Sequence, residues 1–261
     1  MRIDVAASLS LSSPAPATAL LQIAVADPVE ERLTVLSGGH PPDVDEFEVD
    51  GARVHRFAVA EGETTVAYTA AAETGGPPRR VTPAEWASAL RPSRYCPSDQ
   101  LEGFATAEFD RDLPRAKLVH TVADWVHRRL IYTSGASRPV DTAVDTLLAG
   151  QGVCRDYAHL TLSLLRALEV PARLVAVYAP GLSPMDFHAV VEADIDGTWC
   201  VVDATRLAPT SSLVRICSGR DAADTAFLTT LGGVARFETM TVTATTAGAL
   251  PIPDQAPFPL P

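Results

Sequence analysis

The chain has 261 residues, of which 47% are hydrophobic and 20% charged, so it can form one large domain or two small ones and is too apolar to be disordered throughout. Its 21 basic and 32 acidic residues give a net charge of −11, which argues against binding to duplex DNA or an anionic membrane, because such a polyanion repels it on average. No stretch approaches the roughly 18 uncharged apolar residues that a membrane-spanning helix needs.

Short β-like runs fill the first part of the chain, residues 1–75, and are separated by proline, glycine and aspartate. Within them, Val49-Asp50-Gly51-Ala52 is typical of a two-residue hairpin turn. We therefore predict a small N-terminal antiparallel β domain over residues 1–75. The turn-rich segment GGPPRRVTP, residues 75–83, is the predicted boundary of that domain.

Helical patterns follow this boundary. The sequence predicts short helices over residues 83–90 and 141–149 and an amphipathic helix over 114–130, in which apolar residues recur at spacings of three and four. A further helix begins at Cys154, directly after a glycine and a valine, and ends before Pro171.

The remainder of the chain begins with three β-like runs, residues 173–178, 187–195 and 199–205. A helical stretch near 221–231 and a strand near 236–245 are predicted after them. The Pro-rich tail, residues 246–261, is predicted to be disordered. These patterns predict an α+β protein, in which residues 76–245 form a second domain with the Cys154 helix packed on an antiparallel sheet.

Cys154 is placed where a reactive cysteine would be expected. The free N–H groups and the dipole of a helix N-terminus stabilise a thiolate, which is the nucleophilic form of cysteine. The next N–H groups of the same turn can hold an oxyanion. A cysteine at this position is also compatible with a small buried packing residue, so position alone leaves both interpretations open.

His188 and Asp203 lie on the second and third of the β-like runs. Asp196-Gly197 predicts a two-residue hairpin loop between these strands. In that register His188 and Asp203 are diagonal neighbours on one sheet face, where the carboxylate can accept the Nδ1 proton of the imidazole and stabilise an imidazolium. A register shift of one residue would place them on opposite faces, as two unrelated residues of an exposed hairpin.

A cysteine at a helix N-terminus, followed by histidine and aspartate on adjacent strands, is the order found in papain-like thiol enzymes. The motifs GVCRDYAH (152–159), FHAVVE (187–192) and DGTWCVVDAT (196–205) resemble the transglutaminase-like superfamily. PSRYCPSD (92–99), YTSGAS (132–137) and GRDAAD (219–224) look like its bacterial members. The resemblance covers about residues 1–245.

The resemblance implies a papain-like transglutaminase core and assigns roles to three residues. Cys154 would be the nucleophile, His188 the general base and then acid, and Asp203 the orienting carboxylate. Many relatives carry tryptophan two residues after the histidine, where this chain has Val190.

Four further residues are candidates for oxyanion binding or support of the site. Trp125, Tyr132 and Gln151 are candidates for the second oxyanion donor, although a packing or turn role fits each of them as well. Arg155 follows the nucleophile, where it would favour the thiolate or pair with Asp156 to fix the start of the helix.

The implied reaction is acyl transfer at an amide bond through a cysteine thioester, with no cofactor. The sequence contains no calcium loop, and its four cysteines have no metal-like spacing, so we expect no metal site. Hydrolysis of a peptide or amide substrate is favoured, because nothing in the sequence marks an amine-binding site.

Three alternatives remain open at this level: a protein cross-linker that transfers the acyl group to an amine, an acyltransferase similar to the arylamine acetyltransferases, and a catalytically idle binding module. The first residues lack the apolar core of a secretory signal, which predicts a cytoplasmic protein. The sequence does not predict the oligomeric state.

Overall fold

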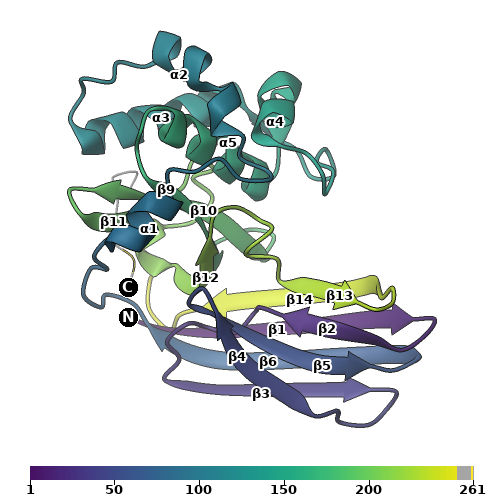
Figure 1. The fold of residues 1–261 in the computed structure, drawn as a ribbon. Helices are drawn as coiled ribbons and strands as arrows, with labels where there is room; N and C mark the ends of the chain where they lie inside the picture. The colour runs from purple at the N-terminus through teal and green to yellow at the C-terminus, as the bar shows by residue number, and fades with distance from the viewer. Residues whose placement is uncertain (252–259, 261) are drawn as a thin grey trace.

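The computed structural model describes residues 1–251 and residue 260. Two layers of strands form a β-sandwich at one end, and helices gather at the other end around a third sheet (Figure 1). The first six strands are β1 (Arg2–Ser13), β2 (Ala17–Leu21), β3 (Glu30–Ser37), β4 (Val44–Val49), β5 (Ala52–Val59) and β6 (Gly62–Glu73).

The sandwich follows from the alternating pattern of its strands. Along β1, every second residue from Ile3 to Leu11 is buried, because successive side chains of a strand point to opposite faces. The predicted hairpin joins β4 to β5, and positive φ angles of 51° at Asp50 and 81° at Gly51 give the tight turn that such a connection requires.

Two strands from the far end of the chain complete the sandwich. β13 (Leu228–Leu231) pairs with β2, and β14 (Arg236–Thr245) pairs with β1, so the sheet orders are β13-β2-β5-β4 and β14-β1-β6-β3. The sequence placed both segments in the second domain, because a local pattern shows that a segment is extended but not which strand it pairs with.

The helix predicted near 221–231 is wrong. Asp221 instead accepts hydrogen bonds from the main-chain N–H groups of Tyr95 and Ala223, at 2.8 Å each, which hold residues 220–226 in turns. The β-branched Thr229 and Thr230 that follow lie in β13, where such residues are favoured.

The remaining helices and strands include all the others that were predicted, and also short helices or strands within 98–108, 131–132, 151–152 and 210–219 that the sequence did not predict. They are α1 (Pro83–Ser88), η1 (Ser98–Gln100), α2 (Glu102–Glu108), α3 (Arg115–Arg129), β7 (Ile131–Tyr132), α4 (Ala143–Ala149), β8 (Gln151–Gly152), α5 (Cys154–Ala167), β9 (Ala172–Tyr178), β10 (Phe187–Ile195), β11 (Thr198–Val202), η2 (Thr210–Ser212) and β12 (Val214–Gly219). The third sheet has the antiparallel order β11-β10-β9-β12. Helix α5 packs on β9 and β10 and is buried from Asp156 to Ala167.

The third sheet is joined to the sandwich by a continuous apolar core. Val214, Ile216 and Cys217 of β12 belong to the same buried cluster as the inner face of the sandwich. The hydroxyl of Tyr178 in β9 donates a 2.8 Å hydrogen bond to the carbonyl of Ile23, and its ring stacks with Tyr68 at a centroid distance of 6.5 Å. The sandwich therefore supports the sheet that carries His188.

The predicted disordered tail, residues 246–261, falls largely on residues 252–259 and 261, which lie outside the described residues. Leu260 is described and is buried against an apolar cluster that includes Val177 and Leu213. Among the described residues, no helix is long and apolar enough to cross a membrane.

Candidate active site

Cys154 is the first residue of α5 and is partly exposed, while the helix behind it is buried. Asp156 caps this end, because its Oδ2 accepts a 2.8 Å hydrogen bond from the main-chain N–H of Val153. A Cβ on Gly152 would lie 2.6 Å from the Cβ of Asp156, so only glycine fits before this turn. The sequence thus fixes the start of the helix at the cysteine.

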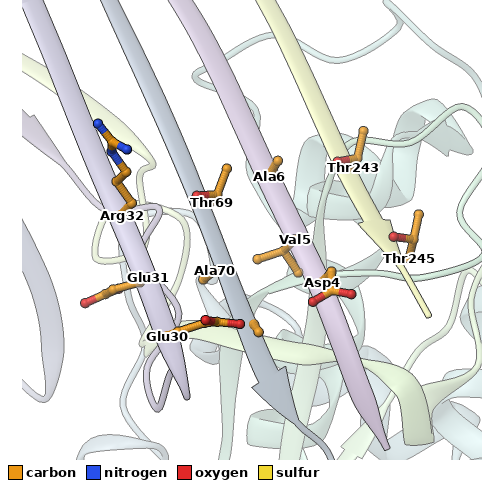
Figure 2. Close-up of a pocket in the computed structure, with 11 residues that line it drawn as sticks. Asp4, Val5, Ala6, Glu30, Glu31, Arg32, Thr69, Ala70, Thr243 and Thr245 are labelled. Carbon is orange, nitrogen blue, oxygen red and sulfur yellow. The ribbon is translucent and has the colours of Figure 1, made fainter. Parts of the chain in front are cut away.

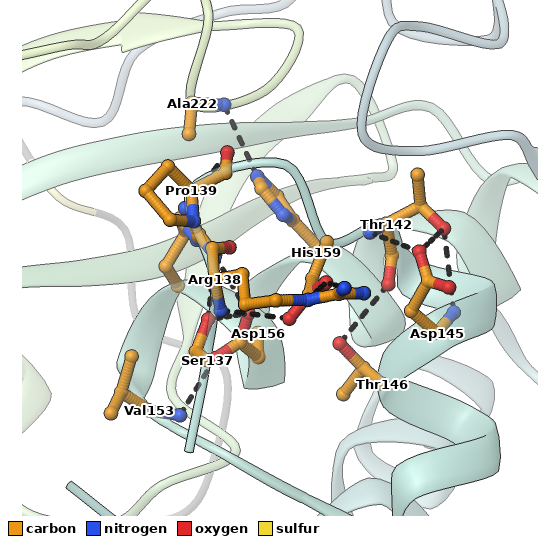
Figure 3. A network of polar contacts seen from close by, with 12 residues as sticks. Ser137, Arg138, Pro139, Thr142, Asp145, Thr146, Val153, Asp156, His159 and Ala222 are labelled. Carbon is orange, nitrogen blue, oxygen red and sulfur yellow. Dashed lines mark hydrogen bonds and ion pairs between the residues drawn. The ribbon is translucent and has the colours of Figure 1, made fainter. Parts of the chain in front are cut away.

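A polar network holds the loop that faces this helix end (Figure 3). Ser137 donates a 2.9 Å hydrogen bond to Asp156, and Arg155 donates 2.6 Å hydrogen bonds to Ser137 and to the carbonyl of Arg138. Arg155 also lies 3.2 Å from Asp156, the pairing considered from the sequence. Its guanidinium therefore holds the loop and the cap rather than the sulfur of Cys154.

The predicted hairpin register is confirmed. Val191 pairs with Val202 and Ile195 with Thr198, around the turn at Asp196-Gly197. His188 and Asp203 consequently lie on one face, and Nε2 of the imidazole is 2.8 Å from Oδ2 of the carboxylate. Both side chains are buried, with 0% and 2% of their surface exposed.

The ring orientation differs from the expected one. We predicted that Asp203 accepts the Nδ1 proton, whereas the structure pairs the carboxylate with Nε2. Nδ1 makes no hydrogen bond to the described residues. Because the opposite ring nitrogen is engaged, Nδ1 is the nitrogen available to the thiol of Cys154, which lies near enough to influence His188 electrostatically.

Burial and charge act in opposite directions on this pair. Burial lowers the pKa of His188, but the attraction and hydrogen bond of Asp203, with a contribution from Cys154, outweigh it and raise that pKa to about 10. Burial likewise opposes ionisation of Asp203, yet His188 and Thr205 hold the pKa of this carboxyl below its usual value. The arrangement therefore favours an imidazolium beside an ionised carboxylate.

Thr205 is a residue of this site that the sequence interpretation missed. Its main-chain N–H and its hydroxyl each donate a 2.8 Å hydrogen bond to Oδ1 of Asp203, which fixes the carboxylate. Asp-Ala-Thr is the spacing at which an aspartate side chain commonly bonds the backbone two residues on, so the signal was present. Helix α3 supports the same segment, because Nδ1 of His127 lies 2.9 Å from the carbonyl of Ala204.

The three candidates for the second oxyanion donor are placed differently. The indole N–H of Trp125 donates a 2.8 Å hydrogen bond to Glu108, so it is already engaged. Gln151 is exposed on β8, which pairs in parallel with β7. Tyr132 lies beside Cys154: burial and Cys154 raise the pKa of its hydroxyl to about 12, an effect that the main-chain N–H of Cys154 opposes.

A hollow of about 430 Å³ lies on the outer face of the sandwich, over β1, β3, β6 and β14 (Figure 2). Its lining is made of threonine, alanine, valine, carboxylates and one arginine, with neither cysteine nor histidine. Within residues 1–251 and 260, no group of three or more histidine, cysteine, aspartate or glutamate side chains could hold a metal ion. The chemistry-bearing side chains gather instead where α5 meets β10.

Comparison with known proteins agrees with this geometry. Residues 105–204 match a model of the transglutaminase-like superfamily. The structure of a candidate cysteine protease from Cytophaga hutchinsonii is 32% identical, with a TM-score of 0.86, over 99% of this chain and 93% of that one. The chain belongs to the transglutaminase-like superfamily, as its motifs indicated.

Two curated relatives are uncharacterised mycobacterial proteins. One, from Mycobacterium leprae, is 28% identical over 149 residues, which is 52% of this chain and 52% of that protein. Another, from Mycobacterium tuberculosis, is 31% identical over 110 residues, which is 40% of this chain and 33% of that protein. The chain thus spans about half the length of the first relative and a third of the second.

Proposed function

We propose that this protein transfers acyl groups from amide bonds through a thioester on Cys154, with water as the usual acceptor, as a peptidase or amidase. The observation that carries the proposal is the buried His188–Asp203 pair, 2.8 Å apart, beside a cysteine at the N-terminus of α5. The raised pKa of His188 supports an imidazolium at neutral pH, and an adjacent cation stabilises a thiolate.

In the proposed reaction, the Sγ of Cys154 attacks the carbonyl carbon of the substrate amide. The negative oxygen that forms is held by the main-chain N–H at the start of α5 and by the Tyr132 hydroxyl. His188 donates its Nδ1 proton to the leaving amine, the C–N bond breaks, and the thioester remains.

His188 is then neutral and takes a proton from a water molecule, whose oxygen attacks the thioester. The C–S bond breaks, the acid is released, and Cys154 returns as a thiolate beside the imidazolium. Asp203 stays ionised throughout and keeps the ring oriented through its bond to Nε2. An amine in place of water would give transamidation, which a substrate screen with and without added amines distinguishes.

The proposed function also implies a type of substrate and a cellular compartment. A peptide or amide substrate, without nucleic acid or membrane, is the proposed partner. A cytoplasmic location is proposed with it, and the four free cysteines, Cys96, Cys154, Cys200 and Cys217, are compatible with a reducing compartment.

The proposal is tested by the pH dependence of alkylation. The proposed thiolate–imidazolium pair predicts that iodoacetamide labels Cys154 in wild type at a nearly constant rate from pH 6 to 9, because His188, whose pKa is raised to about 10, stays cationic over that range and would stabilise the thiolate. In His188→Ala, labelling should instead rise about tenfold per pH unit below pH 8, as for an ordinary thiol with pKa about 8.5. Peptide mass spectrometry measures both rates.

The buried Cys96 and Cys217 are internal controls in the same digest, since burial raises the pKa of both thiols to about 12. Labelling of Cys154 that follows the ordinary thiol curve in wild type would refute the thiolate–imidazolium pair.

Tyr132→Phe should lower the turnover of an amide substrate by about 10²–10³-fold, as expected when one oxyanion donor is removed. Trp125→Phe is the matched aromatic control and should retain near-wild-type turnover in the folded protein, because its N–H is committed to Glu108. The Cys154 alkylation rate should stay the same in both variants. Equal turnover in the two variants would argue against Tyr132 as a donor.

A further inference from the structure

A cavity of about 470 Å³ lies where the β4–β5 turn of the sandwich meets α1 and the C-terminal end of α5. Its volume is that of a small-molecule site. Five arginines line it: Arg79, Arg91, Arg166, Arg173 and Arg220. Three carboxylates, those of Asp50, Glu85 and Asp224, also line it. Arginines outnumber carboxylates here, although acidic residues dominate the chain.

Arg166 contributes a buried positive charge to the wall of this cavity. It is 4% exposed, and its hydrogen bonds go to main-chain carbonyls, including those of Ala89, Ala172 and Arg220, and to the hydroxyl of Ser93. These acceptors satisfy the guanidinium hydrogen atoms without neutralising its charge. Burial accordingly lowers the pKa of Arg166.

Arg173 provides a second buried guanidinium, stacked on the ring of Trp199 at 4.2 Å. Its Nε donates to Glu192 at 2.8 Å and its Nη1 to Glu85 at 2.7 Å. Its Nη2 is buried and has no hydrogen-bond partner within the described residues. A buried donor without an acceptor is unfavourable, so Arg173, which lines the cavity, has one guanidinium nitrogen that lacks an acceptor.

The rim adds two exposed arginines, Arg79 and Arg91, which form no ion pair within residues 1–251. Two of the rim carboxylates are already engaged: Glu85 with Arg173, and Asp224 with Arg220 at 2.8 Å. An anion bound in the cavity would therefore reduce the repulsion among these positive charges.

We propose that this cavity is a binding site for a small organic anion that carries a phosphate or carboxylate group. The planar guanidinium fork matches both groups, and Arg79 and Arg91 would contact the anion in front of Arg166 and Arg173. A long polyanion is disfavoured, because Asp50 and Asp224 also line the opening.

The anion site is separate from the proposed thioester chemistry. Cys154 and Arg166 lie near opposite ends of α5, roughly 18 Å apart at about 1.5 Å per residue. Since the two sites share no residue, an experiment can refute one proposal without refuting the other.

The test uses inorganic phosphate and acetate as probes for the two anion chemistries, with calorimetry and thermal unfolding on the full chain. At least one probe should bind wild type saturably and raise its melting temperature beyond the effect of sodium chloride at equal ionic strength. The double variant Arg79→Ala/Arg91→Ala should bind that probe at least tenfold more weakly. Arg32→Ala/Arg236→Ala, which removes two exposed arginines of the sandwich, should bind like wild type.

The Cys154 alkylation rate should be the same in all three proteins, which separates this result from a failure of the catalytic proposal. Equal binding by both double variants, or a thermal response that sodium chloride reproduces, would overturn the site. The response to each probe alone identifies phosphate or carboxylate as the preferred group.

Discussion

Asp203→Asn is expected to lower the rate of acyl transfer by about 10³–10⁴-fold while the chain remains folded. The amide can still accept hydrogen bonds from Thr205, which now go to Oδ1 of Asp203, but it cannot stabilise the imidazolium as a carboxylate does. Burial of His188, which lowers its pKa, would then be unopposed by Asp203. The ring should become neutral at pH 7.

The lowered pKa of His188 in Asp203→Asn can also be measured through the reactivity of Cys154. In wild type the raised pKa of His188 keeps the imidazolium until the pH rises through about 10; in Asp203→Asn the imidazolium should already be lost near neutral pH. Alkylation of Cys154 at pH 7–8 should therefore fall in the variant and recover as the pH rises further. Asp112→Asn, at an exposed loop residue, is the matched control. A variant that kept wild-type turnover and labelling would exclude Asp203 from the mechanism.

Glu192→Ala is expected to lower the free energy of unfolding by about 3–5 kcal/mol, the usual loss when one member of a buried ionic group is removed. Glu192 is fully buried, with 0% of its side chain exposed, and it accepts hydrogen bonds from Arg173 at 2.8 Å and from Arg215. Without this carboxylate, two guanidinium groups that are themselves buried face one another with their shared counter-ion removed.

Urea unfolding of Glu46→Ala provides the comparison. Glu46 also bonds an arginine, Arg53, at 2.7 Å, but its side chain is 47% exposed, and removal of a surface ion pair costs about 0–1 kcal/mol. If the two variants lose the same stability, the buried Arg173–Glu192–Arg215 group is not a main contributor to the fold.

Local patterns in the sequence predicted the parts of the site that depend on neighbouring residues. The helix that begins at Cys154 follows from Gly152 before it and from the apolar periodicity after it. The Asp196-Gly197 turn set the register that brings His188 to Asp203, because the length of a two-residue loop leaves one pairing of the strands.

Other features depend on contacts between distant segments. The choice of Nε2 for Asp203 depends on how β10 lies against α5, and a strand register does not specify a ring rotamer. The engagement of Trp125 by Glu108 and the position of Tyr132 beside Cys154 likewise arise from the packing of α2, α3 and β7. These distances are not encoded in any short window of residues.

The sequence by itself determined the family, the α+β class, most of the helices and strands and the facing positions of His188 and Asp203, since these follow from periodicity, turn chemistry and motif order. Only the tertiary structure decided that β13 and β14 complete the N-terminal sandwich and that arginines from distant segments meet in one cavity. The physical reason is that strand partners and buried charge clusters are selected by the global packing of the chain, which no local pattern records.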